Sequence, residues 1–295
     1  MHLRKIQAGV FAFLIVLLLM PIGHALMVLT EVIFQGDALA AAFVIGVIGL
    51  LLVFLGIRMD ANQKAATILG LLGGVIVWTG WVEFSFVWIA HKLNVSPLIE
   101  DGEVATKPEY LVMLSSLGLL STILMFFVSS KTRCQFLIWV QKIFGIHIGT
   151  KALDRGGKFV SVTTFIETTM LLWTFYIVLL LVYDKDIAGQ NHPLTYIVAF
   201  GSLAWSGYLF LRLLRIQQFD YAIRYAVPTV IIFWNFVEVM GRWDLLDEIW
   251  VKPIEHWPEV TAIMLCLIGC VGFYVWEMRR EQSGSKPSHE ASPGT

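Results

Sequence analysis

Long apolar runs follow one another along the chain, separated by short polar segments. Eight of these runs are long enough to form helices across the roughly 30 Å hydrocarbon core of a bilayer, which takes about 20 residues. Because lipid offers free backbone groups no hydrogen-bond partner, each run predicts a transmembrane helix. The predicted spans are residues 7–34, 38–57, 66–90, 110–130, 159–183, 194–212, 225–242 and 259–278.

The composition agrees with this pattern. Hydrophobic residues make up 57% of the chain and charged residues 15%, whereas a soluble domain carries about 25% charged residues. We therefore predict an all-α integral membrane protein with eight transmembrane helices in one polytopic domain, residues 1–282. Arg4 and Lys5 precede the first run as in a signal peptide, but the run continues to Phe34, which favours an uncleaved helix. Residues 283–295 are polar and rich in Ser and Pro, which is typical of a disordered tail.

The basic residues predict the orientation of these spans. Of the 21 Lys and Arg residues, 16 fall in the segments on one side of the predicted helices, and this side includes both ends of the chain. Positive charge concentrates on the cytoplasmic side, so both termini are expected in the cytoplasm and the protein in the inner (plasma) membrane. The net charge of −1 provides no basic field for nucleic acid.

Similar residues recur in two pairs of spans. In spans 66–90 and 225–242 a Glu is followed five residues later by a Trp, and each following loop ends in Pro-Glu. Spans 3–4 and 7–8 are therefore compatible with two parallel four-helix repeats. Chance is the alternative, since Glu, Trp and Pro are common near membrane interfaces. The matching residues are Glu83 with Trp88, Glu238 with Trp243, Pro108-Glu109 and Pro258-Glu259.

Ionisable residues inside the spans are the main functional signal, because placing them in lipid is costly. A rise of about 1.5 Å per residue places His24, Glu83, Asn235 and Glu238 past the midplane toward the outer side. All four lie in odd-numbered spans. If these spans meet at the centre of the bundle, the four side chains form an outward-facing polar pocket. Three more ionisable groups, Glu31, His91 and Arg242, fall nearer the outer surface, and Glu167 lies deeper.

The first interpretation of this cluster is binding or transport of a proton-coupled or cationic small substrate. Buried carboxylates exchange protons near neutral pH, and tryptophan faces beside them attract organic cations. Trp78 and Trp234 lie deep enough to take part, whereas Trp88 and Trp243 fit the interfacial belt. The predicted substrate-binding residues are His24, Glu83, Asn235, Glu238, Trp78 and Trp234.

The second interpretation is an intramembrane metal-dependent redox enzyme that acts on a lipid or quinone. His24, Glu83, His91 and Glu238 are ligand types that suit iron, manganese or zinc. However, no Glu-x-x-His pair occurs, although di-iron helical bundles use such pairs. A haem between His24 and His91 or His192 fits less well, because these residues differ in predicted depth.

The third interpretation is a non-catalytic subunit of a membrane complex. Glu167 lies among threonines and fits a residue that joins helices by hydrogen bonds. Glu109 and Glu259 each follow a proline at a predicted helix start, which is a position that stabilises the helix dipole. The pattern favours substrate binding or transport, and it leaves open whether the protein is an enzyme. The expected partners are the lipid bilayer, a small molecule or cation, and other subunits of a complex.

Two local patterns predict packing. Gly70 and Gly74 form a Gly-x-x-x-Gly pair, which lets a neighbouring helix approach closely. Apolar residues line one helical face of residues 133–149, which fits either a helix on the cytoplasmic membrane surface or a simple connector. The three cysteines provide no disulfide framework, and Cys266 and Cys270, four residues apart on one helix face, fit small packing residues.

Overall fold

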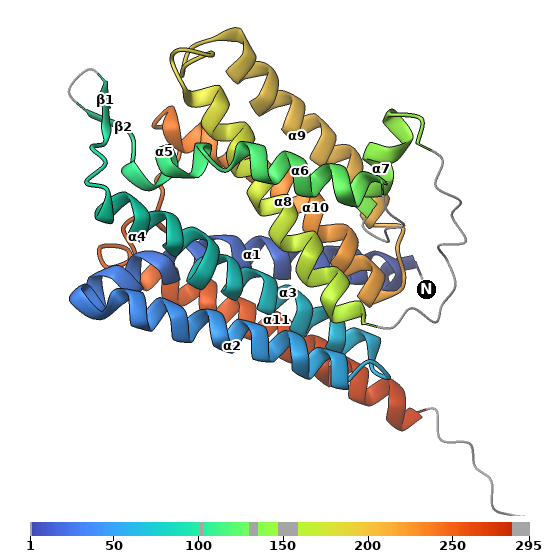
Figure 1. Cartoon of the computed structure of the whole chain (residues 1–295). Coiled ribbons are helices and arrows are strands. Elements are labelled where there is room, and N and C mark those ends of the chain that lie inside the picture. Colours follow the sequence, from blue (N-terminus) through green and yellow to red (C-terminus); the bar gives the residue numbers. More distant parts are fainter. Residues whose placement is uncertain (1, 101–102, 130–134, 147–158, 285–295) are drawn as a thin grey trace, which may run out of the picture.

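The molecule is a bundle of helices with a small antiparallel hairpin at one end (Figure 1). The structure is a computed structural model, and it describes residues 2–100, 103–129, 135–146 and 159–284. In chain order the elements are α1 (His2–Phe34), η1 (Gln35–Asp37), α2 (Ala38–Arg58), α3 (Gln63–Val77), η2 (Trp78–Glu83), α4 (Phe84–Lys92), β1 (Leu98–Glu100), β2 (Glu103–Thr106), α5 (Pro108–Leu114), α6 (Leu117–Ser129), α7 (Gln135–Ile143), α8 (Val160–Tyr183), α9 (Pro193–Leu213), α10 (Phe219–Arg242) and α11 (Trp257–Gly284).

The structure confirms an all-α class and a set of apolar helices that suits a membrane. Among the described residues, five helical stretches are long and apolar enough to cross one, and the number is six if the bent pair α5 and α6 forms one span. Helices also occupy most of each of the eight predicted runs. The apolar part of α11, Trp257–Phe273, is shorter than a full span. The count of eight spans therefore stays a prediction. The five stretches are Gln7–Arg58, Gln63–Lys92, Val160–Tyr183, Pro193–Leu213 and Phe219–Arg242.

The first of these stretches folds back on itself. The short η1 segment interrupts it, and Gln35 there has a positive φ of 39°. Beyond this turn α2 runs back along α1 and packs on α3 (Figure 1). The hairpin places the start of α1 and the end of α2 at the same end of the bundle.

Close backbone contact joins α3 to α8. A Cβ at Gly70 would collide with the backbone oxygen of Ser161, and a Cβ at Gly74 would come within 3.0 Å of Thr168. Gly70 thus leaves room that no other residue would leave for α8, and Gly74 makes the contact with Thr168 looser. The close approach predicted from the Gly-x-x-x-Gly pair is therefore confirmed.

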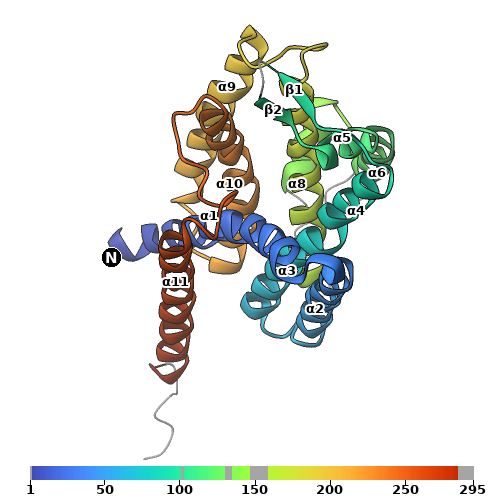
Figure 2. The same ribbon diagram turned by 90° about the vertical axis from the view of Figure 1, so that its left-hand side faces the viewer.

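The core of the bundle is α10, which packs against α1, α8 and α9. Most of its first half is buried, including Ile223, Val227 and Val230. The last helix, α11, packs on α1 and stands to one side of the other helices in Figure 2. The free ends of α1 and α11 lie at the same end of the molecule in Figure 1.

The proposed repeat is not confirmed, because the two units differ in structure. The first contains the irregular segment η2, a β-hairpin and a helix pair bent by 49°. The second contains the uninterrupted helices α10 and α11, joined by a loop in which no strand is described.

The predicted amphipathic segment contains α7, which packs into the protein. Leu137 is buried against Val128, and the Gln141 side-chain nitrogen donates a hydrogen bond to the Val128 backbone oxygen at 2.8 Å. These contacts anchor α7 to α6. The predicted tail from residue 285 onward and Cys134 lie outside the described residues.

Candidate functional site

The candidate site is built on a break in helical geometry. Residues Trp78–Glu83 form one π-helical segment, η2, between the regular helices α3 and α4. Such segments are rare and occur often at functional sites, because the wider turn changes the direction of the side chains. The acidic residue of this segment, Glu83, is its last residue and is 2% exposed.

Contacts with the first two helices hold η2 in place. The Thr79 hydroxyl donates a hydrogen bond to the Gly23 backbone oxygen at 3.2 Å, and Trp81 Nε1 donates one to the Phe43 backbone oxygen at 3.0 Å. A Cβ at Gly80 would lie 2.6 Å from the Gly46 backbone nitrogen, so the glycine lets α2 come close. The segment thus has a fixed position next to His24, the residue after Gly23.

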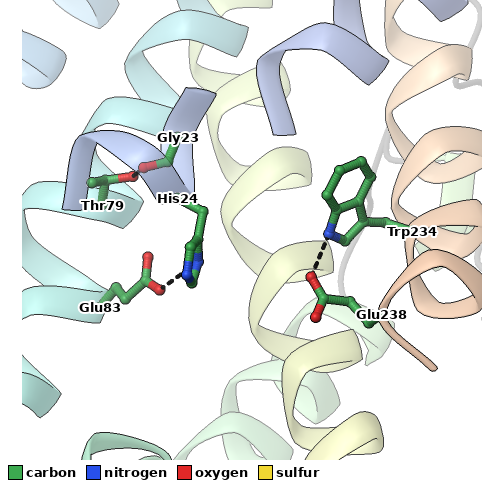
Figure 3. Close-up of polar contacts among 6 residues, drawn as sticks. All are labelled: Gly23, His24, Thr79, Glu83, Trp234 and Glu238. Carbon is green, nitrogen blue, oxygen red and sulfur yellow. Dashed lines mark hydrogen bonds and ion pairs between the residues drawn. The ribbon is translucent and has the colours of Figure 1, made fainter. Parts of the chain in front are cut away.

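His24 and Glu83 form a buried pair. The distance from His24 Nδ1 to Glu83 Oε1 is 3.6 Å, and the side chains are 11% and 2% exposed (Figure 3). The pair is an ion pair only when His24 carries a proton. Within the described part of the chain, His24 Nε2 and Glu83 Oε1 have no hydrogen-bond partner. The pair therefore retains unused capacity to bind a proton or a ligand.

A second carboxylate lies on α10. Trp234 Nε1 donates a 2.6 Å hydrogen bond to Glu238 Oε1, one helical turn away (Figure 3). The loop of residues 243–256 covers this pair, because its buried Trp250 ring lies 4.8 Å from the Trp234 ring. Glu238 is therefore held by its own helix and shielded by the following loop.

The two pairs interact electrostatically through their carboxyl groups. In Figure 3 the Glu83 carboxyl group is directed toward His24, and the His24 ring lies between it and the Trp234–Glu238 pair. Glu31 and Glu109 also act on Glu83, and Glu248 acts on Glu238. The site thus collects five carboxyl groups from α1, η2, α5, α10 and the loop of residues 243–256.

One lysine is the shared cation of this acidic cluster. Lys107 precedes α5 and interacts electrostatically with His24 and with four of the carboxyl groups. Arg242 acts in addition on Glu248. Carboxyl groups outnumber these cations, so the fully ionised cluster is negative. The four carboxyl groups are those of Glu31, Glu83, Glu238 and Glu248.

Three further aromatic rings lie near one another in the same part of the bundle. Trp78 is 3% exposed, and its ring lies 5.6 Å from that of Tyr176. The Tyr110 ring follows at 6.2 Å from Tyr176, and both tyrosines interact electrostatically with Glu83 and Glu238. Carboxyl groups next to aromatic faces form an environment that attracts a small cation.

Glu248 lies outside the candidate membrane helices, in the loop of residues 243–256. Burial raises the pKa of its carboxyl group above the ordinary value of 4.5, against the opposing charges of Lys107 and Arg242. The nearby charge of Asp244 raises this pKa further. Its side chain fits against Gly241, where an added Cβ would lie 2.5 Å from Oε1.

The structure brings most of the predicted binding residues together, with one exception. His24, Glu83, Glu238, Trp78 and Trp234 belong to the arrangement described above. Asn235 does not, because its side-chain nitrogen lies 3.5 Å from the Ser202 hydroxyl on α9. This amide joins α9 and α10 instead. The sequence predicted where this helix lies along the chain. It did not predict which neighbouring helix each face of α10 contacts.

The metal-site prediction for His24, Glu83, His91 and Glu238 is not supported. Within the described residues, no group of three or more His, Cys, Asp or Glu side chains is placed to hold a metal ion. His24 and Glu83 are in contact, but Glu238 accepts a hydrogen bond from Trp234. His91 is exposed at the end of α4 and acts on Glu31.

Several residues of the cluster were missed or assigned another role. Glu109 was interpreted as a helix-dipole residue, and it does lie in the first turn of α5 after Pro108. Glu109 is also buried, with only 9% of its surface exposed, and its carboxyl group acts electrostatically on Glu83. In the sequence, the feature that could have identified Glu109 as part of the site is an acidic residue directly before an apolar run. No sequence pattern distinguished the other members of the cluster. They lie near predicted span ends or among ordinary aromatic residues, and they are Lys107, Tyr110, Tyr176 and Glu248.

The chain matches no protein-family model, no curated protein and no solved structure. The functional argument therefore comes from this site.

Proposed function

We propose that this protein binds a small organic cation at the outer end of its helices and exchanges it for a proton, as a transporter or receptor does. The observation that carries this proposal is that two carboxyl groups inside the helices interact electrostatically, those of the buried Glu83 and the partly buried Glu238. They lie on different helical elements, one beside His24 and the other beside the Trp234 ring (Figure 3). Lys107 compensates only part of the negative charge.

The proposal places eight helices in the inner membrane with both termini in the cytoplasm. The positive-charge bias of the sequence supports this orientation. The arrangement in Figure 1 is consistent with it, because the free ends of α1 and α11 lie at one end of the bundle and the β-hairpin lies at the other. The acidic cluster is then near the outer surface.

The chemistry of the site favours a cation over an anion or a neutral ligand. A charged carboxylate in an apolar interior is costly unless a counter-charge accompanies it. A proton or a cationic ligand can supply that charge. Tryptophan and tyrosine faces add to the attraction for an organic ammonium group, by about 0.5–2 kcal/mol for each well-placed ring.

The His24–Glu83 pair provides a route for the proton. Imidazole nitrogen and carboxyl oxygen are 3.6 Å apart, so a proton can pass between them after a small rearrangement. When a singly charged cation binds beside Glu83 and Glu238, its charge replaces that of one proton, which one of the two carboxyl groups releases. Binding of a cation and release of a proton are therefore linked.

Calorimetry of the purified protein tests this proposal. Tetraethylammonium is titrated into the detergent-solubilised protein in two buffers with different ionisation enthalpies. We expect saturable binding, and a difference in heat between the buffers that reports released protons. Glu83→Gln and Glu238→Gln are each expected to weaken binding at least tenfold. Glu259→Gln, an exposed acid at the start of α11, is the matched control and should bind normally.

The proposal is wrong if no organic ammonium compound of graded size binds to the wild-type protein. It is also wrong if Glu259→Gln weakens binding as much as the two site variants, because that result indicates only general charge attraction. A circular dichroism spectrum and a single elution peak for each variant show that it is folded.

A further inference from the structure

A second charged cluster lies far from the acidic site, where α9 ends and α10 begins. The Arg212 guanidinium carbon lies 5.8 Å from the Tyr208 ring centre, and its Nη1 is 3.5 Å from the Tyr208 hydroxyl. The Arg224 guanidinium carbon lies 5.9 Å from the Tyr221 ring centre. We call these four residues the Arg–Tyr cluster.

The two Arg–Tyr pairs belong to one surface. The helices α9 and α10 pack against each other and are joined by a short connection. Tyr225 on α10 interacts electrostatically with Arg212, Tyr208 and Tyr221, so the residues of both helices are neighbours. Arg224 precedes Glu238 by about 21 Å along α10 at 1.5 Å per residue, which separates this surface from the acidic cluster.

The cluster has unused capacity to bind an anion. Arg224 Nε is buried and has no hydrogen-bond partner among the described residues. In sequence, Arg215 lies three residues after Arg212, and Asp220 lies in the first turn of α10, four residues before Arg224. Arginine carries several donors in a planar arrangement that matches the oxygens of a phosphate group.

Apolar surface adjoins these charges. Tyr208 is 57% exposed and Leu211 is 61% exposed, on a helix that qualifies as a membrane span. Arg212 lies in the last turn of this helix, where a span meets the headgroup region. A ligand that fits both parts has a negatively charged head and apolar tails.

We propose that the Arg–Tyr cluster binds the phosphate headgroup of an anionic phospholipid. The two guanidinium groups, from adjacent helices, contact the phosphate, and the lipid tails lie along the exposed face of α9. Basic surfaces between membrane helices recognise anionic lipid heads in this way. The site is separate from the acidic cluster and does not depend on the function proposed for it.

Native mass spectrometry tests this site directly. The detergent-purified protein is mixed with equal amounts of phosphatidylglycerol and phosphatidylcholine that have the same acyl chains. We expect one phosphatidylglycerol to be retained in preference to phosphatidylcholine. Arg212→Gln and Arg224→Gln should each weaken this retention about fivefold, because one basic residue near anionic lipid contributes about that factor. The lysine variants at both positions keep the charge and should lose less.

Arg58→Gln is the matched control, because Arg58 is an exposed arginine in the last turn of α2. It should retain phosphatidylglycerol like the wild type. Equal retention of the two lipids by the wild type overturns the proposal, and so does an equal loss in Arg58→Gln. Displacement of the lipid by millimolar inorganic phosphate also contradicts it, because that result indicates a site for free phosphate.

Discussion

Single side chains in the acidic site differ in how their charge is stabilised. Glu238 accepts a short hydrogen bond from Trp234, whereas Glu83 depends on His24 at 3.6 Å. The indole N–H of Trp234 is neutral and does not change its protonation, so the hydrogen bond to Glu238 persists when other groups of the site gain or lose a proton. The His24–Glu83 contact changes strength with the protonation of the imidazole. Within the site, the position of Glu238 is thus fixed by a hydrogen bond that does not depend on protonation, whereas the contact of Glu83 does depend on it.

Trp234→Phe tests the anchoring of Glu238. The change removes the indole donor and leaves a partly buried carboxyl oxygen without its partner, which costs about 1 kcal/mol of stability. We expect a lower thermal midpoint in detergent. In a Glu238→Gln background the same change should cost less, because the carboxyl acceptor is gone. Equal losses in the two backgrounds would show that the hydrogen bond is not the cause.

Glu248→Gln tests the effect of pH on stability. The pKa of Glu248 is raised in the folded protein, so the folded state binds this proton more tightly than the unfolded state. The resulting stabilisation is complete below pH 4.5, the ordinary pKa, and is lost as pH rises through the folded pKa. The variant lacks this dependence, so wild type should lose stability relative to it as pH rises above 4.5.

The measurement is the difference in thermal midpoint between wild type and Glu248→Gln over this pH range. Glu255→Gln is the control, because the Glu255 side chain is 69% exposed on the same loop. A constant difference across the range, or the same slope with Glu255→Gln, would exclude Glu248 as the source.

Among the secondary-structure elements, the π-helical segment η2 has the largest effect on the site. It joins two regular helices and is held by Thr79, Gly80 and Trp81 against α1 and α2. A regular helix through the same residues would rotate Glu83 relative to His24. The segment therefore sets the geometry of the buried pair.

Gly80→Ala tests this positioning role. The added methyl group would lie 2.6 Å from the Gly46 nitrogen and 2.7 Å from the Ala42 oxygen, and both are backbone atoms. Overpacking of this kind costs about 1–3 kcal/mol, so the thermal midpoint should fall. Because η2 must shift, tetraethylammonium binding should weaken as well.

Gly201→Ala on α9 is the matched control, since no atom lies within 4 Å of the added Cβ. It should be neutral or slightly stabilising, because alanine favours helix by about 1 kcal/mol over glycine. If the Gly80→Ala protein is destabilised but binds tetraethylammonium normally, the geometry of η2 does not affect binding. This result would contradict its positioning role.

At the scale of the whole molecule, the account depends on how many helices cross the membrane. Single cysteines placed in loops of a cysteine-free variant can be labelled in intact cells with a membrane-impermeant maleimide. Eight spans with both termini inside predict labelling at Ser96, Asp186 and Leu246. Asn62 and Gln217 should label only after the membrane is opened. Labelling of Asn62 or Gln217 in intact cells would contradict this topology.

The helices were predictable from sequence because apolar runs of sufficient length have few alternatives in lipid. His24, Glu83 and Glu238 could also be selected as candidates, since an ionisable residue within such a run is unusual. The direction of each side chain was harder to predict. Asn235 turns to Ser202 because helical periodicity defines a face but does not identify the helix it meets. The π-helical turn at η2 depends on tertiary contacts and has no sequence signature that we used.

The central claim is that a cation and a proton replace one another at Glu83 and Glu238. Infrared difference spectroscopy measures this exchange on the carboxyl groups themselves. On addition of tetraethylammonium, the wild type should lose absorption from protonated carboxyl groups and gain absorption from carboxylate. Glu83→Gln and Glu238→Gln should each reduce this change, whereas Glu259→Gln should leave it intact. An unchanged carboxyl spectrum in the wild type, or the full change in both site variants, would contradict the account.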